Sequence, residues 1–336
     1  MSFARRAWAQ VMYRGRDFSS LVLSFTYNDN YDKTDGLNIQ FADADMRWTK
    51  DWFPETGESL EATIHMRDWA SAGDNRRLPL GVFEIGSVKY SDTVTLDAMA
   101  VPFTSSPRSE KKNRSWKKIS LQGIAGDIAG NAGIKLFYDT GVDPFYDVAD
   151  QNDKSDIEFL EMLCKSDGLC LKVTNRKLIV FEEAKYEAKS PVMRIVRGGS
   201  EIIDHPKFRR NARDVYKSCE VSHFDPKTDQ LYTGHFQAPK VGNVGHELVI
   251  REQFNSESDD INLDRKARAR LREQNKNEWT CDVNMLGDVI YQAGQNIEIV
   301  GWNRFDGIYH IASCAHNLRD NGYNTSLRTR RCLEGY

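Results

Sequence analysis

The sequence predicts a mostly β fold of the α+β class, in which two β-barrel domains flank a small inserted α/β domain. One β-hairpin pattern occurs twice, near the two ends of the chain, and the residues between the copies have helical periodicity. A length of 336 residues is enough for two or three domains. We expect the boundaries at 1–103 for the first barrel, 104–115 for a linker, 116–190 for the α/β domain and 191–336 for the second barrel with one helix at about 261–276.

The repeated pattern is a glycine turn, an aliphatic–Glu step, a second glycine and an alternating strand that reaches a serine six residues later. The first copy covers 57–61 and 81–88, with an insert of about 68–79, and the second covers 294–298 and 307–314. Fixed offsets of these residue types are a stronger signal than alternation alone. We infer a duplicated β domain, with a chance match of common turn patterns as the alternative. Two like domains per chain would let a small oligomer form a ring of twice as many units.

The composition is that of an ordinary globular protein, with 40% apolar and 28% charged residues. A formal net charge of -3 does not point to bulk binding of nucleic acid or anionic membranes. No run of ~18 apolar residues predicts a membrane span, and the first residues lack the apolar stretch of a Sec signal. The cysteines have no CxxC spacing, so we expect them to be reduced and mostly buried: Cys164, Cys170, Cys219, Cys281, Cys314 and Cys332.

The first barrel is predicted from strands at 36–42 and 60–66 and from a hairpin of 82–90 with 94–101. Three aromatic residues ahead of a proline are expected to plug one end of it: Trp48, Trp52 and Phe53. The following stretch 104–115 has no apolar residue, which is typical of a linker or exposed loop. Its basic residues could contact an acidic partner, but we favour a solvated loop: Arg108, Lys111, Lys112 and Arg114.

The α/β domain begins where the periodicity becomes helical. Its first helix is predicted from apolar residues near helical spacing: Ile119, Leu121, Ile124, Ile128 and Ala132. Gly133 ends this helix, and a short strand follows at 134–138. A second helix opens with a capping box, in which Ser155 accepts from an early N–H and Glu158 reaches back.

The rest of the chain is predicted to be hairpins and one further helix. A hairpin of 169–173 with 177–181 completes the α/β domain, and another joins 219–224 to 230–236 through a Pro-containing turn. The helix is predicted at 264–275, where one apolar residue recurs every fourth position: Leu263, Ala267 and Leu271.

That helix carries the densest basic run of the chain, 265–272. A nucleic-acid interface would need stacking aromatics or base-reading side chains beside the basic face, and this run contains none. We therefore expect a helix that lies across a sheet, with its arginines in solvent or salt-bridged to a neighbouring subunit.

Two further groups of residues could carry chemistry. His310, Cys314 and His316 share a strand face by even spacing, with Cys281 as a possible neighbour, but strand spacing does not make zinc ligands converge. We expect the two histidines at an interface or in solvent.

The acids of 143–156 could suggest glycosidase carboxylates, which would have to face each other across a sugar cleft. We expect them instead in a loop that leads into a capped helix, where negative charge is favourable: Asp143, Asp147, Asp150, Asp153 and Asp156. No nucleophile-elbow, HExxH, P-loop or dinucleotide motif occurs. The sequence thus predicts no catalytic, cofactor-binding or metal-binding residue.

Trp116, the run 119–129 (ISLQGIAGDIA) and the run 143–147 (DPFYD) resemble the phage late control D family of tail hub proteins. Shorter matches extend the resemblance over almost the whole chain: 51–54, 73–76, 150–151, 155–156, 159–160, 163–164, 168–169, 171–174, 177–181, 286–288, 293–295 and 306–309. These motifs are structural, so they indicate architecture more than chemistry.

The resemblance implies a structural baseplate hub of a contractile phage tail or tail-like injection particle, and not an enzyme. Three subunits, each with two tube-like β-barrel domains, would form a ring of pseudo-sixfold symmetry that adapts a hexameric tail tube to a trimeric spike. The implied location is the baseplate of a virion or tail-like particle, assembled in the bacterial host cytoplasm. We also expect acidic side chains along the bore.

The implied partners are two further copies of the chain, the tail tube protein, the spike protein, other baseplate proteins and, as a further candidate, the tape-measure protein. Larger relatives carry a lysozyme or needle domain, for which this chain leaves no room after residue 331, so we expect a separate spike polypeptide. No sequence-specific nucleic acid and no cofactor is expected. The alternative function is a tail-associated cell-wall hydrolase or carbohydrate-binding protein. The resemblance covers phages and headless tail-like bacteriocins alike.

Overall fold

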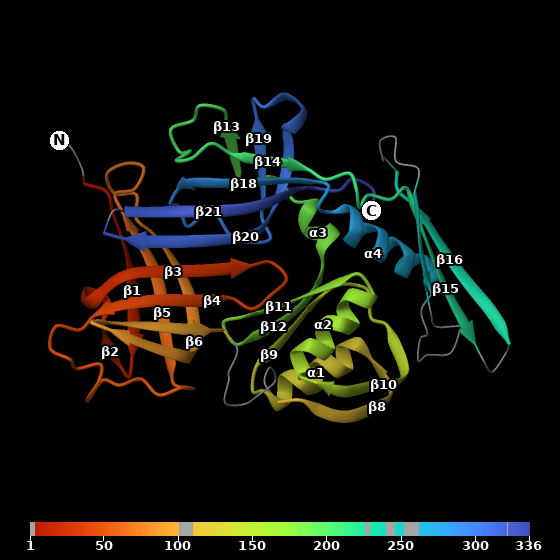
Figure 1. Ribbon diagram of the computed structural model, residues 1–336, viewed down its shortest axis with the longest axis horizontal. Helices are drawn as coiled ribbons and strands as arrows, with labels where there is room; N and C mark the ends of the chain where they lie inside the picture. The colour runs from red at the N-terminus through yellow and green to blue at the C-terminus, as the bar shows by residue number, and fades with distance from the viewer. Residues whose placement is uncertain (1–3, 101–109, 226–228, 240–245, 252–261, 321) are drawn as a thin grey trace.

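The computed structural model describes residues 4–100, 110–225, 229–239, 246–251, 262–320 and 322–336. The chain is mostly β and elongated (Figure 1). Its N-terminal strands, called here the first β unit, are β1 (Arg6–Tyr13), β2 (Arg16–Asp17), β3 (Val22–Asn30), β4 (Gly36–Ala42), β5 (Ser59–Arg67), β6 (Arg76–Ser91) and β7 (Thr93–Met99). The α/β unit follows, with β8 (Lys112–Ser120), α1 (Leu121–Asn131), β9 (Lys135–Asp139), β10 (Phe145–Lys154), α2 (Asp156–Ser166), β11 (Leu169–Thr174), β12 (Lys177–Glu182) and α3 (Glu183–Glu187).

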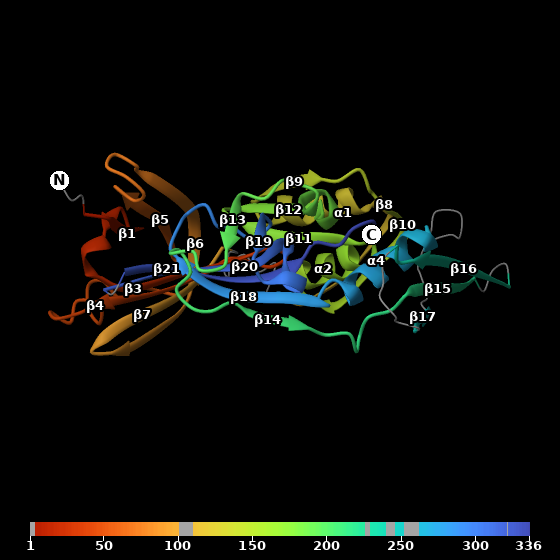
Figure 2. The same ribbon diagram turned by 90° about the horizontal axis from the view of Figure 1, so that it is seen from above.

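The remaining chain forms two further groups of elements. The second β unit contains β13 (Met193–Val196), β14 (Lys207–Arg210), β18 (Trp279–Leu286), β19 (Asn296–Val300), β20 (Gly307–Arg319) and β21 (Gly322–Arg331). The side sheet contains β15 (Ser218–Asp225), β16 (Gln230–Gln237) and β17 (Glu247–Arg251), covered by α4 (Leu263–Asn275). Short 3-10 turns occur at Ser19–Leu21 and Asn303–Phe305. Seen from above, the first β unit and the side sheet lie at opposite ends of the molecule (Figure 2).

The two β units have the same strand order. The first reads β1-β5-β6-β7-β4-β3 and the second reads β13-β19-β20-β21-β18-β14. At each position of the sheet, the strand has the same rank along the chain in both units. The units differ at the outer strand, because β1 runs antiparallel to β5 whereas β13 runs parallel to β19. The side sheet is an insertion between β14 and β18 of the second unit.

The repeated hairpin is confirmed down to its hydrogen bonds. The Gly57 N–H donates to the carbonyl of Ile85 at 2.8 Å, and the Gly294 N–H donates to the carbonyl of Ile311 at 2.9 Å. Both glycines have φ near +90°, a conformation that costs other residues strain. A β-bulge follows each of the two isoleucines at the same offset, which the alternation of the sequence alone does not reveal.

The two β units join into one sheet of 13 strands, because β3 of the first pairs with β20 of the second (Figure 1). The prediction of two separate closed barrels differs from this result, since the sheet stays open within the described ranges. The physical reason is that the open edge of β3 pairs with β20 of the other unit. In a closed barrel that edge would pair with a strand of its own unit.

The buried apolar residues form four clusters. One lies in each β unit, one in the α/β unit and one between α4 and the side sheet. The stretch 191–336 contains two of these clusters, one in the second β unit and one between α4 and the side sheet. The apolar stripe of α4 contributes to the latter cluster as predicted: Leu263, Ala267 and Leu271.

The helices of the α/β unit follow their predicted signals. Ser155 accepts from the Glu158 N–H while the Glu158 carboxylate accepts from the Ser155 N–H, so the capping box is confirmed. Of the predicted linker 104–115, residues 104–109 lie outside the described residues, and 112–115 belong to strand β8. That strand is so polar because Trp116 is its only buried residue. The acids expected in a loop lie in large part on strand β10, which pairs with β8.

Candidate functional site

The seam between β3 and β20 is the contact that makes one sheet from the two β units. The strands run antiparallel in register from Ser313 opposite Asn30 to Arg319 opposite Ser24. On the buried side the ring of Tyr27 stacks on His316, with centroids 5.9 Å apart. On the other side the Thr26 hydroxyl donates to the Asn317 side-chain oxygen at 3.1 Å.

One face of the continuous sheet is polar over both β units, because the strands alternate buried apolar residues with partly exposed polar ones. Side chains on this face bond across strands, as Asn38 does to Asp97 at 2.6 Å and Asn317 to Asn324 at 3.1 Å. Charged members of this face include Glu84, Lys89, Asp97, Lys207, Arg209, Asp282, Arg319 and Arg328.

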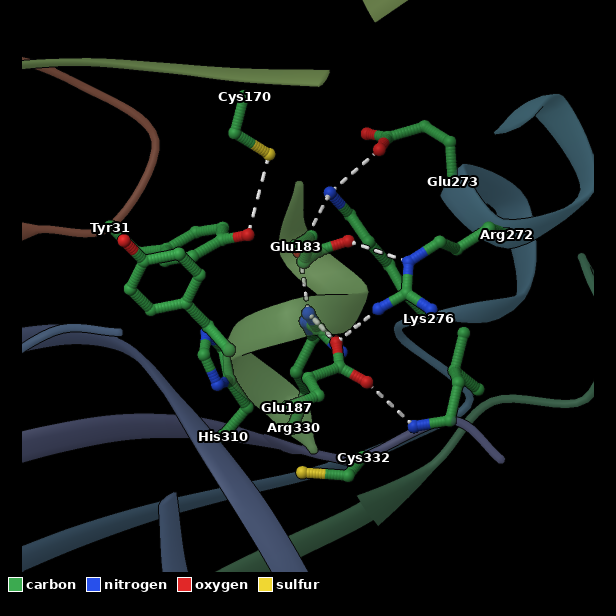
Figure 3. A network of polar contacts seen from close by, with 12 residues as sticks. Tyr31, Cys170, Glu183, Glu187, Arg272, Glu273, Lys276, His310, Arg330 and Cys332 are labelled. Atoms are coloured by element: carbon green, nitrogen blue, oxygen red, sulfur yellow. Dashed lines mark hydrogen bonds and ion pairs between the residues drawn. The ribbon is translucent and has the colours of Figure 1, made fainter. Parts of the chain in front are cut away.

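A buried ionic cluster ties the α/β unit to the second β unit and to the side sheet (Figure 3). Glu183 and Glu187 of α3 both accept from Arg330 of β21 and from Arg272 of α4. Lys276 lies 3.8 Å from Glu183. Burial alone would raise the pKa of Glu183, but Arg330, Lys276 and Arg272 outweigh it and lower that pKa to about 2. The cluster fixes the relative positions of three groups of elements.

A second buried ion pair ties the α/β unit to the first β unit. Lys172 of β11 contacts the carboxylates of Asp29 and Asp35, which flank the end of β3. Burial raises the pKa of Asp35 to about 6, although Lys172 opposes this change. The Asp29 carboxylate also accepts from the Ala293 N–H at 2.8 Å, so it contacts both β units at the seam.

The basic helix α4 lies across the side sheet as predicted, but the expectation for its arginines needs correction. Arg265 and Lys266 pair with Asp167 at the end of α2, and Arg272 joins the buried cluster. These three cations therefore bind acids of the same chain. The run could not show this, because the partner acids lie 85 to 99 residues away in sequence.

The two histidines are also placed differently from the expectation, since both are fully buried. His310 contacts Asn296 at 2.8 Å and His316 contacts Tyr323 at 2.6 Å. Burial lowers the pKa of His310 to about 3, with Arg330 adding to the effect, and lowers the pKa of His316 to about 4. The Cys314 sulfur lies 3.3 Å from His316, but no group of three metal-ligating side chains occurs among the described residues.

The acids of 143–156 serve local structure. Asp156 is buried and pairs with Lys112 and Arg114, while Asp143 accepts from the N–H of Gln122 at the start of α1.

The cysteines are all free; four are buried, and Cys170 and Cys332 are partly exposed. No described helix has both the length and the apolar character needed to cross a membrane.

No protein-family model matches the sequence, and no curated protein matches it. Solved structures do match. The 43 kDa tail protein of prophage MuSo2 from Shewanella oneidensis has a TM-score of 0.69 at 12% identity, covering 97% of this chain and 98% of the other. The tail protein from Neisseria meningitidis MC58 has a TM-score of 0.70 at 14% identity, covering 97% and 96%.

A third similar structure comes from a different class of machine. The E. coli c3393 protein is a component of the type VI secretion system with structural similarity to T4 bacteriophage tail proteins gp27 and gp5. It has a TM-score of 0.60 at 12% identity and covers 97% of this chain and 78% of that one. At these identities the similarity establishes a shared fold over almost the entire length, and the chain therefore has the fold of phage tail proteins and of a type VI secretion component.

Proposed function

We propose that this chain is the structural baseplate hub of a contractile phage tail or tail-like injection particle, as a homotrimeric ring of pseudo-sixfold symmetry. One observation carries the proposal: a β unit of one strand order occurs twice in the chain and is joined edge to edge by the β3–β20 seam. Three chains would supply six such units, which matches a hexameric tail tube on one side and a trimeric spike on the other. The similarity in fold to tail proteins supports this role.

In this proposal the polar face of the sheet lines the bore. Mixed amide and hydroxyl side chains, bonded across strands, would give a polar wall along the path of a passing polymer. The charged residues of the face are of both signs, with Lys89, Lys207, Arg209, Arg319 and Arg328 beside Glu84, Asp97 and Asp282. The acidic bore expected from the resemblance stays a prediction.

The α/β unit and the side sheet then form the outer part of the hub, attached through buried ion pairs. We propose a structural role and no catalytic step. The proposed partners are the tail tube protein, a separate spike polypeptide and further baseplate proteins, at the baseplate of a particle assembled in the bacterial cytoplasm.

The proposal is tested by light scattering of the purified chain over a range of concentrations, alone and with the tail tube protein of the same particle. For the chain alone we expect three times its mass of 38.5 kDa; if the trimer forms only on the tube protein, we expect a complex whose mass contains three copies of the chain. A mass that stays at one chain under both conditions would reject the hub.

A further inference from the structure

The open edges of the sheet are the feature that the fold leaves unexplained. Strand β14 ends the strand order of the second unit, in the position that β3 holds in the first. Strand β6 holds the position of β20, and its residues 87–91 pair with β7 on one side, whereas the pairing with β5 on the other side ends at Glu84. In β20 the corresponding residues pair with β3. Exposed strand edges are templates for pairing with another chain.

We infer that β14 of one subunit pairs antiparallel with residues 87–91 of β6 in the next, repeating the β3–β20 seam between subunits. This inference deepens the proposed trimeric hub and rests on it. Each ring would contain three seams within chains and three between chains, so the sheet would close only in the assembly. The second copy supplies the strand that completes the edge of β6.

The register follows from matching the two units strand by strand. Strands β6 and β20 have a bulge after equivalent isoleucines, so counting from the bulge makes Tyr90 the equivalent of His316. Strand β3 pairs with β4, and β14 pairs with the equivalent strand β18, which makes Phe208 the equivalent of Tyr27. An independent contact supports the match. Tyr27 meets Phe83 edge-on at 6.1 Å in the first unit, and Phe208 meets its counterpart Tyr309 at 6.5 Å in the second.

This register accounts for an exposed aromatic residue. His316 is fully buried against Tyr27, whereas Tyr90 is 45% exposed in the single chain. Between subunits, Phe208 would lie opposite Tyr90 and would cover it as Tyr27 covers His316. An aromatic cross-strand pair at the centre of a strand contact adds stability as well as register.

The polar side of the same register places Arg209 opposite Lys89, as Asn28 lies opposite Ala315 in the seam. Lys89 is held by Asp97 at 3.0 Å, and this carboxylate would lie beside the incoming guanidinium as well. In a single chain the two positions are seven strands apart, at ~4.8 Å per strand. Cysteines placed there cannot join within one chain, because a disulfide needs Cα atoms within ~7 Å.

The test is oxidation of the double variant Lys89→Cys/Arg209→Cys, followed by non-reducing electrophoresis. The matched control is Lys89→Cys/Lys207→Cys, which keeps the same faces but shifts the register by two residues. We expect the first variant to form covalent trimers and the control to form roughly tenfold less, because its Cα atoms lie beyond bridging distance. Equal products from both variants, or none from either, would overturn the inference.

Light scattering of the unmodified chain separates this result from the hub proposal. A trimer that yields no 89–209 cross-link keeps the hub and rejects the β14–β6 contact. A chain that neither trimerises nor cross-links counts against both. Light scattering of the control variant Lys89→Cys/Lys207→Cys under reducing conditions shows whether the cysteine substitutions by themselves change the mass of the protein.

Discussion

Arg330 illustrates at the scale of one residue how the outer units are attached. It is 3% exposed and donates to both Glu183 and Glu187; Arg272 also pairs with both carboxylates, and Lys276 lies near Glu183. Arg330→Met should lower the free energy of unfolding by about 3–5 kcal/mol, because two carboxylates lose one of their cations while staying buried. The control Arg194→Met removes an exposed pair with Glu298 and should cost about 0–1 kcal/mol. Urea unfolding measures both, and equal effects would refute a structural role of the cluster.

The buried histidines predict a dependence of stability on pH. The pKa of His310 is lowered to about 3 and that of His316 to about 4, so both stay neutral in the fold while the unfolded chain binds protons below about 6.5. The contribution of the two histidines to the free energy of unfolding is therefore fully present above that pH. It falls as the pH drops toward 4, by up to roughly 3 kcal/mol per pH unit for the two together. Asp35, whose pKa is raised, acts in the opposite direction.

His310→Asn isolates one of these contributions, because the asparagine amide can still donate to Asn296. We expect the difference in unfolding free energy between the parent and the variant to shrink as the pH falls from 7 to 4.5. A difference that is constant over this range would mean that His310 does not titrate with unfolding. Glu183, with a pKa lowered to about 2, adds a separate loss of stability below pH 4.5.

The attachment of α4 to the side sheet depends at the element scale on one glycine. A Cβ at Gly234 of β16 would lie 2.2 Å from the backbone carbonyl carbon of Leu263. Gly234→Ala should therefore destabilise the chain by about 1–3 kcal/mol through overpacking. The control Gly130→Ala, in α1, meets no atom within 4 Å and should stabilise by about 0.5–1 kcal/mol. Thermal unfolding that moves both variants in the same direction would contradict this account.

Elements whose signals are local could be predicted from the sequence. The capping box at Ser155, the stripe from Leu263 to Leu271 and the repeated glycine offsets each lie within a few residues of the structure that they specify. Contacts between distant segments could not. The partners of Arg272 and the burial of His316 depend on chain segments whose proximity no periodicity encodes.

The same limit applies at the scale of the whole molecule. The duplication was visible in the sequence, but the seam joins β3 to β20, nearly the full length of the chain apart. Separate barrels were the natural expectation for two like β units, because a barrel is the simplest way to remove strand edges. The chain instead shares one pair of edges internally and leaves an equivalent pair open, which a ring of identical subunits would close.

Electron cryomicroscopy of the assembled particle would show directly how the subunits join. We expect a threefold ring in which six like β units alternate, with β3–β20 seams inside each chain and β14–β6 seams between chains, and with Phe208 against Tyr90. A ring joined through other surfaces, with β14 left uncovered, or a particle without threefold symmetry would contradict it.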